Sequence, residues 1–153
     1  MNGTSDPGKD LDAFMGAFSY PARQGLLIQN VTDHPVHPRA DRGNSAAYFS
    51  FPELKTLEAH VSEVPPGEAT GLHRHSCEAL FYVLAGKGYS TVRQDGEVER
   101  RIDWQVGDLF FIPIHAWHRH FNADPLRPAR YLEITTIPLM KSLGAWYIEA
   151  ADE

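Results

Sequence analysis

The stretch of the chain that most constrains the fold is GEATGLHRHSCEALFYVLAG, which runs from Gly67 to Gly86. It places two histidines, His73 and His75, directly before an apolar run at residues 79–85. Because side chains alternate along an extended chain, histidines one residue apart project from the same face and can reach one metal ion. The apolar run is rich in β-forming residues and predicts a strand buried on both faces. The stretch therefore indicates a metal site inside a β-structure.

A second stretch, GDLFFIPIHAWHRHFN at residues 107–122, has the features of a strand, a turn and a returning strand. A Gly-Asp turn precedes the apolar segment 109–112, and Pro113 ends that strand. The segment WHRHF at 117–121 then returns. This arrangement can bring His118 towards His73 and His75.

The two stretches together resemble the paired motifs of the cupin superfamily, G-x5-H-x-H-x3-4-E-x6-G and G-x5-P-x-G-x2-H-x3-N. The matching positions are Gly67, His73, His75, Gly86, Gly107, Pro113, His118 and Asn122. The resemblance implies a double-stranded β-helix, or jelly-roll barrel, with a divalent metal held by the three matching histidines. Motif 1 covers residues 67–86 and motif 2 covers residues 107–122.

The sequence departs from the family pattern at two positions. Ala79 stands where the family has a glutamate ligand, and it cannot bind metal. The neighbouring Glu78 is expected on the opposite face from His73 and His75, although a β-bulge would turn it inward and make it a fourth ligand. The second departure is His115, which replaces a glycine of the turn; histidine tolerates positive φ better than most residues.

Short predicted strands, separated by turn signals, favour an all-β sandwich or barrel along the rest of the chain. Residues 1–20 are expected to form an arm and a short amphipathic helix, and residues 21–153 a single cupin domain. We expect strands at 26–31, 48–51, 56–64, 87–94, 97–104 and 130–137, and a loop at 32–44. Asp95-Gly96 predicts a hairpin. The tail combines a helical turn with the apolar patch 145–148.

Composition narrows the classes of partner. The chain has 153 residues, a net charge of −6 and no apolar run of membrane-spanning length, so we expect neither a nucleic-acid partner nor a membrane span. The single Cys77 and the absence of a signal-like N-terminus predict a cytoplasmic protein. Because sheet edges need cover, and apolar segments lie at 11–18 and 145–148, we expect a homodimer.

The chemistry of three neutral histidines leaves the charge of a divalent ion uncompensated. This favours a small anionic substrate, with a position left for O2. Imidazole suits several metals; the resemblance to three-histidine dioxygenases of the gentisate type makes Fe(II) the expected ion, with Zn, Ni or Mn as alternatives. His120 shares the parity of His118 and is expected to act behind the ligands or as an acid or base, and His60 is a further candidate for the cavity wall.

Three classes of function follow from these residues and from the resemblance. The first is an iron-dependent dioxygenase of a small aromatic or dicarbonyl acid. The second is a non-oxidative metal-dependent lyase, isomerase or cyclase. The third is a small-molecule-binding cupin without catalysis.

Overall fold

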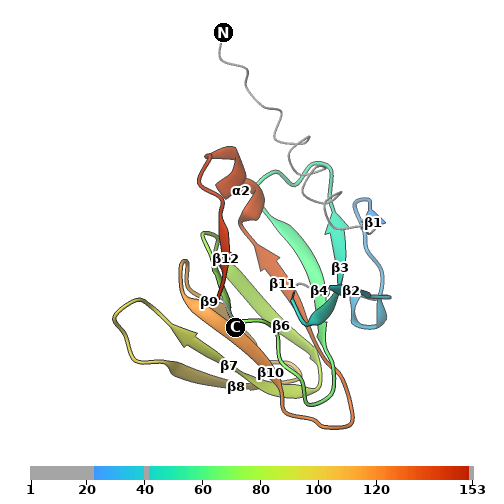
Figure 1. The fold of residues 1–153 in the computed structure, drawn as a ribbon. Coiled ribbons are helices and arrows are strands. Elements are labelled where there is room, and N and C mark those ends of the chain that lie inside the picture. The colour runs from blue at the N-terminus through green and yellow to red at the C-terminus, as the bar shows by residue number, and fades with distance from the viewer. Residues whose placement is uncertain (1–22, 40–41, 152–153) are drawn as a thin grey trace.

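The chain folds into two β-sheets packed face to face, as Figure 1 shows for the computed structural model, which describes residues 23–39 and 42–151. The elements are β1 (Arg23–Gln24), η1 (Val31–Asp33), β2 (His37–Arg39), β3 (Asn44–Ser50), β4 (Glu58–Val64), β5 (His73–His75), β6 (Ala79–Ala85), β7 (Lys87–Arg93), β8 (Arg100–Gln105), β9 (Leu109–Ile112), β10 (Trp117–Asn122), β11 (Ala129–Thr135), α2 (Ile137–Ser142) and β12 (Ile148–Ala150). The predicted all-β fold is confirmed. The helix predicted at 11–18 lies outside the described residues.

Strand order divides each of the two predicted motifs between the sheets, with β6 and β9 in the first sheet and β5 and β10 in the second. The first sheet has the order β1-β3-β4-β11-β6-β9, with β2 paired to β3, and the second has the order β12-β5-β10-β7-β8. All pairings between these strands are antiparallel except that of β1 with β3. The histidine strand β5 and the returning strand β10 are therefore direct neighbours, as the site requires.

The core between the sheets is aromatic. Phe81 on β6 stacks on Phe110 at a centroid distance of 4.8 Å, and Tyr131 meets the edge of Phe81 at 5.3 Å. Val83 and Ile112 are fully buried beside them. The inward parity of Phe81 and Val83 with His75 is confirmed.

The outward face of β6 corrects the prediction that this strand is buried on both sides. Leu80 and Tyr82 are 40% and 45% exposed. They pair with Phe111 and Leu109 on the edge strand β9, which are also exposed. An apolar run of β-forming residues predicts a strand. Whether both faces of that strand are buried depends on which segments elsewhere in the chain pack against it.

The strand predicted at 26–31 is wrong, because only η1 forms there. Asn30 adopts a left-handed conformation with φ of 51°, which ends any extended run, and Leu26 is 83% exposed. Ile28 and Val31 instead pack against the core cluster of Ala47, Phe49 and Val61. The predicted loop 32–44 is also corrected, since β2 forms within it. Among the described strands, β2 pairs with β3 at the edge of the sheet, and an edge strand tolerates a proline such as Pro38.

Candidate metal centre

Three histidines from neighbouring strands of the second sheet form a compact cluster. His73 and His75 lie on β5, and His118 lies on β10 directly opposite His73 in the strand register. One ligand atom of each residue lies within 4.8 Å of the others. The strand pairing therefore brings the two sequence motifs together.

Each ring of the cluster is oriented by its own backbone. Nδ1 of His73 lies 2.9 Å from the carbonyl oxygen of Gly71, Nδ1 of His75 lies 3.0 Å from that of Cys77, and Nδ1 of His118 lies 2.8 Å from that of Ala116. A carbonyl oxygen only accepts, so Nδ1 carries the proton in all three rings. Every Nε2 atom is thereby left with a lone pair, which is the form that binds a metal.

Burial keeps these rings uncharged. Desolvation is the largest cause at each of them: it lowers the pKa of His73 to about 3, lowers that of His75, and lowers that of His118 well below its usual value. Arg42 lowers the pKa of His73 further. Metal ligation requires neutral imidazole, so the protein holds the rings in the protonation state that a metal needs.

The donor set fits a divalent transition metal. Nε2 of His75 is buried and has no hydrogen-bond partner among the described residues, which is costly unless a ligand satisfies it. Three imidazole donors leave coordination positions for other molecules, unlike a closed structural zinc site. Glu78 is exposed and does not join the cluster, while Ala79 is buried. The described residues therefore offer three histidines and no carboxylate within the cluster.

His120 lies inside the barrel on β10, with its ring 5.5 Å from that of His118. Its Nδ1 lies 2.7 Å from Oγ of Ser90, and Nε1 of Trp104 donates to the same hydroxyl at 2.9 Å. Its ring lies 4.9 Å from that of Phe81. Burial lowers the pKa of His120 to about 4, so the ring is neutral near pH 7. The predicted inward orientation is observed.

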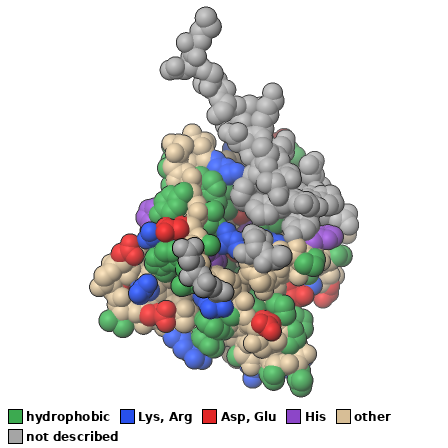
Figure 2. Space-filling model, in the orientation of Figure 1, with side chains coloured by type: hydrophobic (Ala, Val, Ile, Leu, Met, Phe, Trp, Pro, Cys, Tyr) green, Lys and Arg blue, Asp and Glu red, His purple; other side chains and the backbone are tan. Residues whose placement is uncertain are grey.

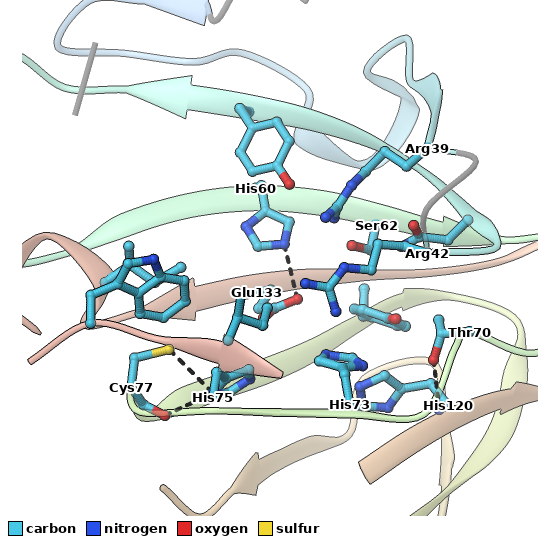
Figure 3. A pocket seen from close by; sticks show the side chains of 16 residues that line it. Arg39, Arg42, His60, Ser62, Thr70, His73, His75, Cys77, His120 and Glu133 are labelled. Carbon is cyan, nitrogen blue, oxygen red and sulfur yellow. Dashed lines mark hydrogen bonds and ion pairs between the residues drawn. The ribbon is translucent and has the colours of Figure 1, made fainter. Parts of the chain in front are cut away.

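A cavity opens in front of the histidine cluster and has a charged wall on its far side. His73, His75 and His120 line one side. His60 and Glu133, from β4 and β11, lie on the opposite side in Figure 3, where Arg42 points towards Glu133. The complete lining is Arg39, Arg42, Asn44, Tyr48, His60, Ser62, Thr70, His73, His75, Cys77, His120, Tyr131, Glu133, Ile137, Trp146 and Ile148.

The far wall contains a buried ionic network. Nδ1 of His60 lies 3.0 Å from Glu58 and its Nε2 lies 2.9 Å from Glu133, so both ring nitrogens face carboxylates. Thr135 donates to Glu58 at 2.8 Å. Burial alone would lower the pKa of His60, but the two carboxylates outweigh it and raise that pKa to about 10. Burial would likewise raise the pKa of Glu133, yet His60 holds it well below its usual range.

Sequence reasoning identified His60 as a candidate but missed Glu133, Arg39 and Arg42. A signal for Glu133 was present: it stands in the apolar strand YLEIT and shares the parity of the inward-facing Tyr131. Arg39 and Arg42 lie in the segment 32–44, for which the sequence predicts a loop, and no periodicity there indicates that their side chains reach the cavity.

Cys77 and His115 both lie beside His75. Cys77 is fully buried, lines the cavity and lies 3.3 Å from Nδ1 of His75; burial raises the pKa of its thiol. His115 adopts a φ of 64°, as its position in place of glycine predicted, and its backbone N–H donates to the carbonyl of His75. Its ring contacts Tyr147 from the C-terminal segment.

The fold and the site together define a class: a two-sheet β-barrel protein with a three-histidine cluster able to hold one metal ion. Residues 60–135 match the cupin domain family, and the chain therefore contains a cupin domain. The predicted membership of the cupin superfamily is confirmed.

Comparisons with individual proteins agree with this assignment. The chain is 35% identical over 101 residues to 5-aminosalicylate 1,2-dioxygenase of Comamonas sp., covering 66% of this chain but 25% of that protein. It is 26% identical over 123 residues to auxin-binding protein T92 of Nicotiana tabacum, covering 75% of this chain and 66% of that one. Its fold is similar to that of salicylate 1,2-dioxygenase of Pseudoaminobacter salicylatoxidans, with a TM-score of 0.61 at 16% identity, covering 97% of this chain and 36% of that one. The chain thus spans about a quarter of the length of its dioxygenase relatives.

Proposed function

We propose that the chain is a metal-dependent dioxygenase domain that acts on a small aromatic acid and holds Fe(II) on His73, His75 and His118. The observation that carries the proposal is a cluster of three Nε2 donors, from the half-buried His73 and the buried His75 and His118, without a carboxylate among them. Relatives named as dioxygenases of 5-aminosalicylate and of gentisate are 35% identical to this chain over 101 and 98 residues.

The expected substrate carries a carboxylate next to a hydroxyl on an aromatic ring. Three neutral ligands leave the double charge of the ion uncompensated, so an anion that chelates through two oxygens is favoured. Arg39 and Arg42 line the same cavity and add positive charge. Guanidinium groups suit carboxylates because they offer donors in a planar fork. The cavity therefore favours a bidentate anion over a neutral ligand.

The apolar part of the cavity suits the ring of such a substrate. Tyr131, Ile137 and Trp146 line it beside the charged groups. When bound, Fe(II) supplies coordination of the substrate oxygens and one-electron chemistry with O2. The protein itself contributes orientation of the ligand, a wall that excludes water and the fixed charges of His60 and Glu133.

Oxygen uptake tests the proposal directly. Protein purified without chelators is analysed for metal, loaded anaerobically with Fe(II), and mixed with gentisate, 5-aminosalicylate or salicylate in an oxygen-electrode cell. We expect uptake with at least one of these acids, together with loss of its ultraviolet absorbance. Uptake equal to that of the His118→Ala variant for every acid would contradict the dioxygenase assignment.

A second candidate function is binding of an aromatic acid without turnover. It is favoured by the likeness to auxin-binding proteins T92 and T85 of Nicotiana tabacum, each of which matches 75% of this chain, against 66% for the 5-aminosalicylate dioxygenase. Calorimetric titration with the same acids separates the two functions: saturable binding without oxygen uptake would assign the chain to this class.

We also propose that the chain forms a homodimer through the outer face of β6 and β9. Leu80 and Tyr82 pair there with Phe111 and Leu109, and all four side chains are between 40% and 63% exposed. β9 ends the sheet, so its other edge has no strand partner among the described residues. An uncharged edge strand beside an apolar face favours pairing with a second copy.

A further inference from the structure

The C-terminal segment 144–151, here called the strap, runs along the metal-ligand strand. Within it, β12 pairs antiparallel with β5, so that Ile148 lies opposite His75 and Ala150 lies opposite His73. The N–H of Ala151 also donates to the carbonyl of Leu72. Residues that are opposite each other in an antiparallel pair project from the same face. Ile148 therefore shares the cavity-facing side of His75.

The strap supplies part of the cavity wall. Trp146 and Ile148 both line the cavity, as alternation along an extended segment predicts. Cys77 lies in the same wall and is fully buried. Its neighbour Ser76 is bound to the strap in both directions: the N–H of Ser76 donates to the carbonyl of Tyr147, and the N–H of Tyr147 donates to Oγ of Ser76 at 2.8 Å.

Two further anchors of the strap are polar and near the surface. Glu149 forms an ion pair with Arg74 at 2.7 Å. The hydroxyl of Tyr147 lies 2.6 Å from Nδ1 of His115, and the two rings are nearly parallel, with an interplanar angle of 11°. β12 itself is exposed along its length and ends its sheet. Segments with few buried contacts open at the lowest free-energy cost.

His115 is the unusual member of this contact. It holds a φ of 64°, a conformation that disfavours side chains other than glycine, at the turn that precedes β10. Its backbone N–H donates to the carbonyl of the metal-ligand residue His75. Strained backbone persists where surrounding contacts hold it in place. A histidine here, unlike glycine, can reach Tyr147 and join the turn to the strap.

We propose that the strap is a lid over the metal centre, that the His115–Tyr147 contact is its latch, and that Trp146 and Ile148 set the size of ligand that the closed cavity admits. The proposal rests on the proposed function only for the identity of the ligand. The closure itself follows from the contacts above.

The reactivity of the Cys77 thiol measures opening of the strap. This test requires no bound metal, no catalytic turnover and no ligand. Because this thiol is buried in the wall against which the strap lies, a thiol reagent reaches it only when the wall opens. We expect Tyr147→Phe and His115→Asn to raise the labelling rate of the full chain about threefold or more, since each removes the hydrogen bond of the latch. Asparagine keeps the tolerance for positive φ but is too short to replace the ring. Tyr89→Phe, on the outer side of β7, is the matched control and should label as the wild type does.

Equal labelling of wild type and both latch variants would overturn the latch, and so would an equal rise in Tyr89→Phe. Hydrogen exchange of the wild type gives an independent test should a variant fail to fold. The amide of Ser76 donates to the strap residue Tyr147, and the amide of Ala151, in the strap, donates to Leu72. Both should exchange faster than the amides of Val83 and Tyr131. Equal protection would overturn the lid.

Ligand size is tested by binding. Trp146→Ala should shift the preference of the metal-loaded protein from a one-ring towards a two-ring hydroxy acid, measured as the ratio of the dissociation constants of salicylate and 1-hydroxy-2-naphthoate. An unchanged ratio would overturn the role of Trp146. Labelling and exchange need no ligand, so failure of the dioxygenase assay leaves their results intact.

Discussion

At the scale of single residues, the centre depends on how each histidine is held. Three Nδ1 atoms donate to carbonyls of their own loops and strands, so ring orientation is decided by local backbone. Such contacts raise the basicity of the ligand nitrogen and fix its direction. The site is thus prepared before any metal arrives.

Removing one ligand should therefore remove the metal. We expect His73→Ala, His75→Ala and His118→Ala each to weaken metal affinity by more than about tenfold, because two imidazoles cannot replace three. Metal content by mass spectrometry and calorimetric titration measure this, with circular dichroism to check folding. Glu78→Ala is the control, since that side chain is exposed, and should keep its metal. Stoichiometric metal in a folded His118→Ala protein would contradict the three-histidine centre.

The buried network around His60 should make the free energy of unfolding fall as pH rises into the alkaline range. Its pKa is raised to about 10 in the folded protein, against about 6.5 in the unfolded chain. The stabilisation that protonated His60 contributes is fully present below pH 6.5 and is lost as pH rises through 10. Between these values the free energy of unfolding falls by up to about 1.4 kcal/mol per pH unit. The charged and titratable groups that face it are Glu58 on its own strand, Glu133 on β11, and Tyr48, Arg39 and Arg42 at the cavity.

Replacement of His60 tests this network. We expect His60→Gln to lower the free energy of unfolding at pH 7 by about 3 kcal/mol, because it leaves buried carboxylates without their cation. The variant should also lose less stability than the wild type between pH 7 and 10. Urea unfolding across this range measures both effects, and parallel stability curves for the two proteins would show that His60 is not charged.

At the scale of elements, the barrel requires close approach of backbone at one position on β7. Gly88 is paired with Trp104 on β8 and with Asn122 on β10. A Cβ atom there would lie 2.1 Å from the carbonyl oxygen of Phe121 and 2.3 Å from the indole of Trp104. Only glycine lets the strands pass at this distance, and the adjacent indole bonds to Ser90, the partner of His120.

Alanine at this position should therefore disrupt the barrel. We expect Gly88→Ala to cost about 3 kcal/mol or more of unfolding free energy, since backbone and a packed indole would both have to move. Gly71→Ala is the control, because nothing lies within 4 Å of its Cβ position and its φ is not in the left-handed region. Thermal unfolding followed by circular dichroism compares them. Similar melting temperatures would contradict the packing argument.

At the scale of the whole molecule, surface chemistry differs between regions. Figure 2 shows basic and acidic side chains interspersed among hydrophobic ones on the face it presents. The outer face of β6 and β9 is instead apolar, and the half-buried Leu84, Leu132 and Ile134 flank the four exposed side chains there. No described helix is long and apolar enough to cross a membrane.

The proposed homodimer is tested on this face. The four exposed side chains present about 400 Å² of accessible surface. Together with the flanking residues, this is enough for the core of an interface that buries about 800 Å² per partner. Light scattering should give a dimer mass at micromolar concentration, and Phe111→Glu should give a monomer. Leu126→Glu, at a side chain that is 84% exposed on the β10–β11 loop, should remain dimeric. A wild-type monomer would contradict the proposal.

The sequence by itself determined the two motifs, the strands that carry them and the inward parity of His73, His75 and Phe81. These features are local: side chains alternate with period two, and a turn is set by a few neighbouring residues. The positive φ of His115 was predictable for the same reason.

Only the tertiary structure decided which side chains complete the cavity and which face of β6 stays exposed. Glu133 meets His60 because β11 pairs with β4, and Trp146 joins the wall because β12 pairs with β5. The apolar patch predicted at 145–148 packs along its own chain through the same pairing. Such contacts join segments far apart in the sequence, and the periodicity of a single strand carries no information about its partners.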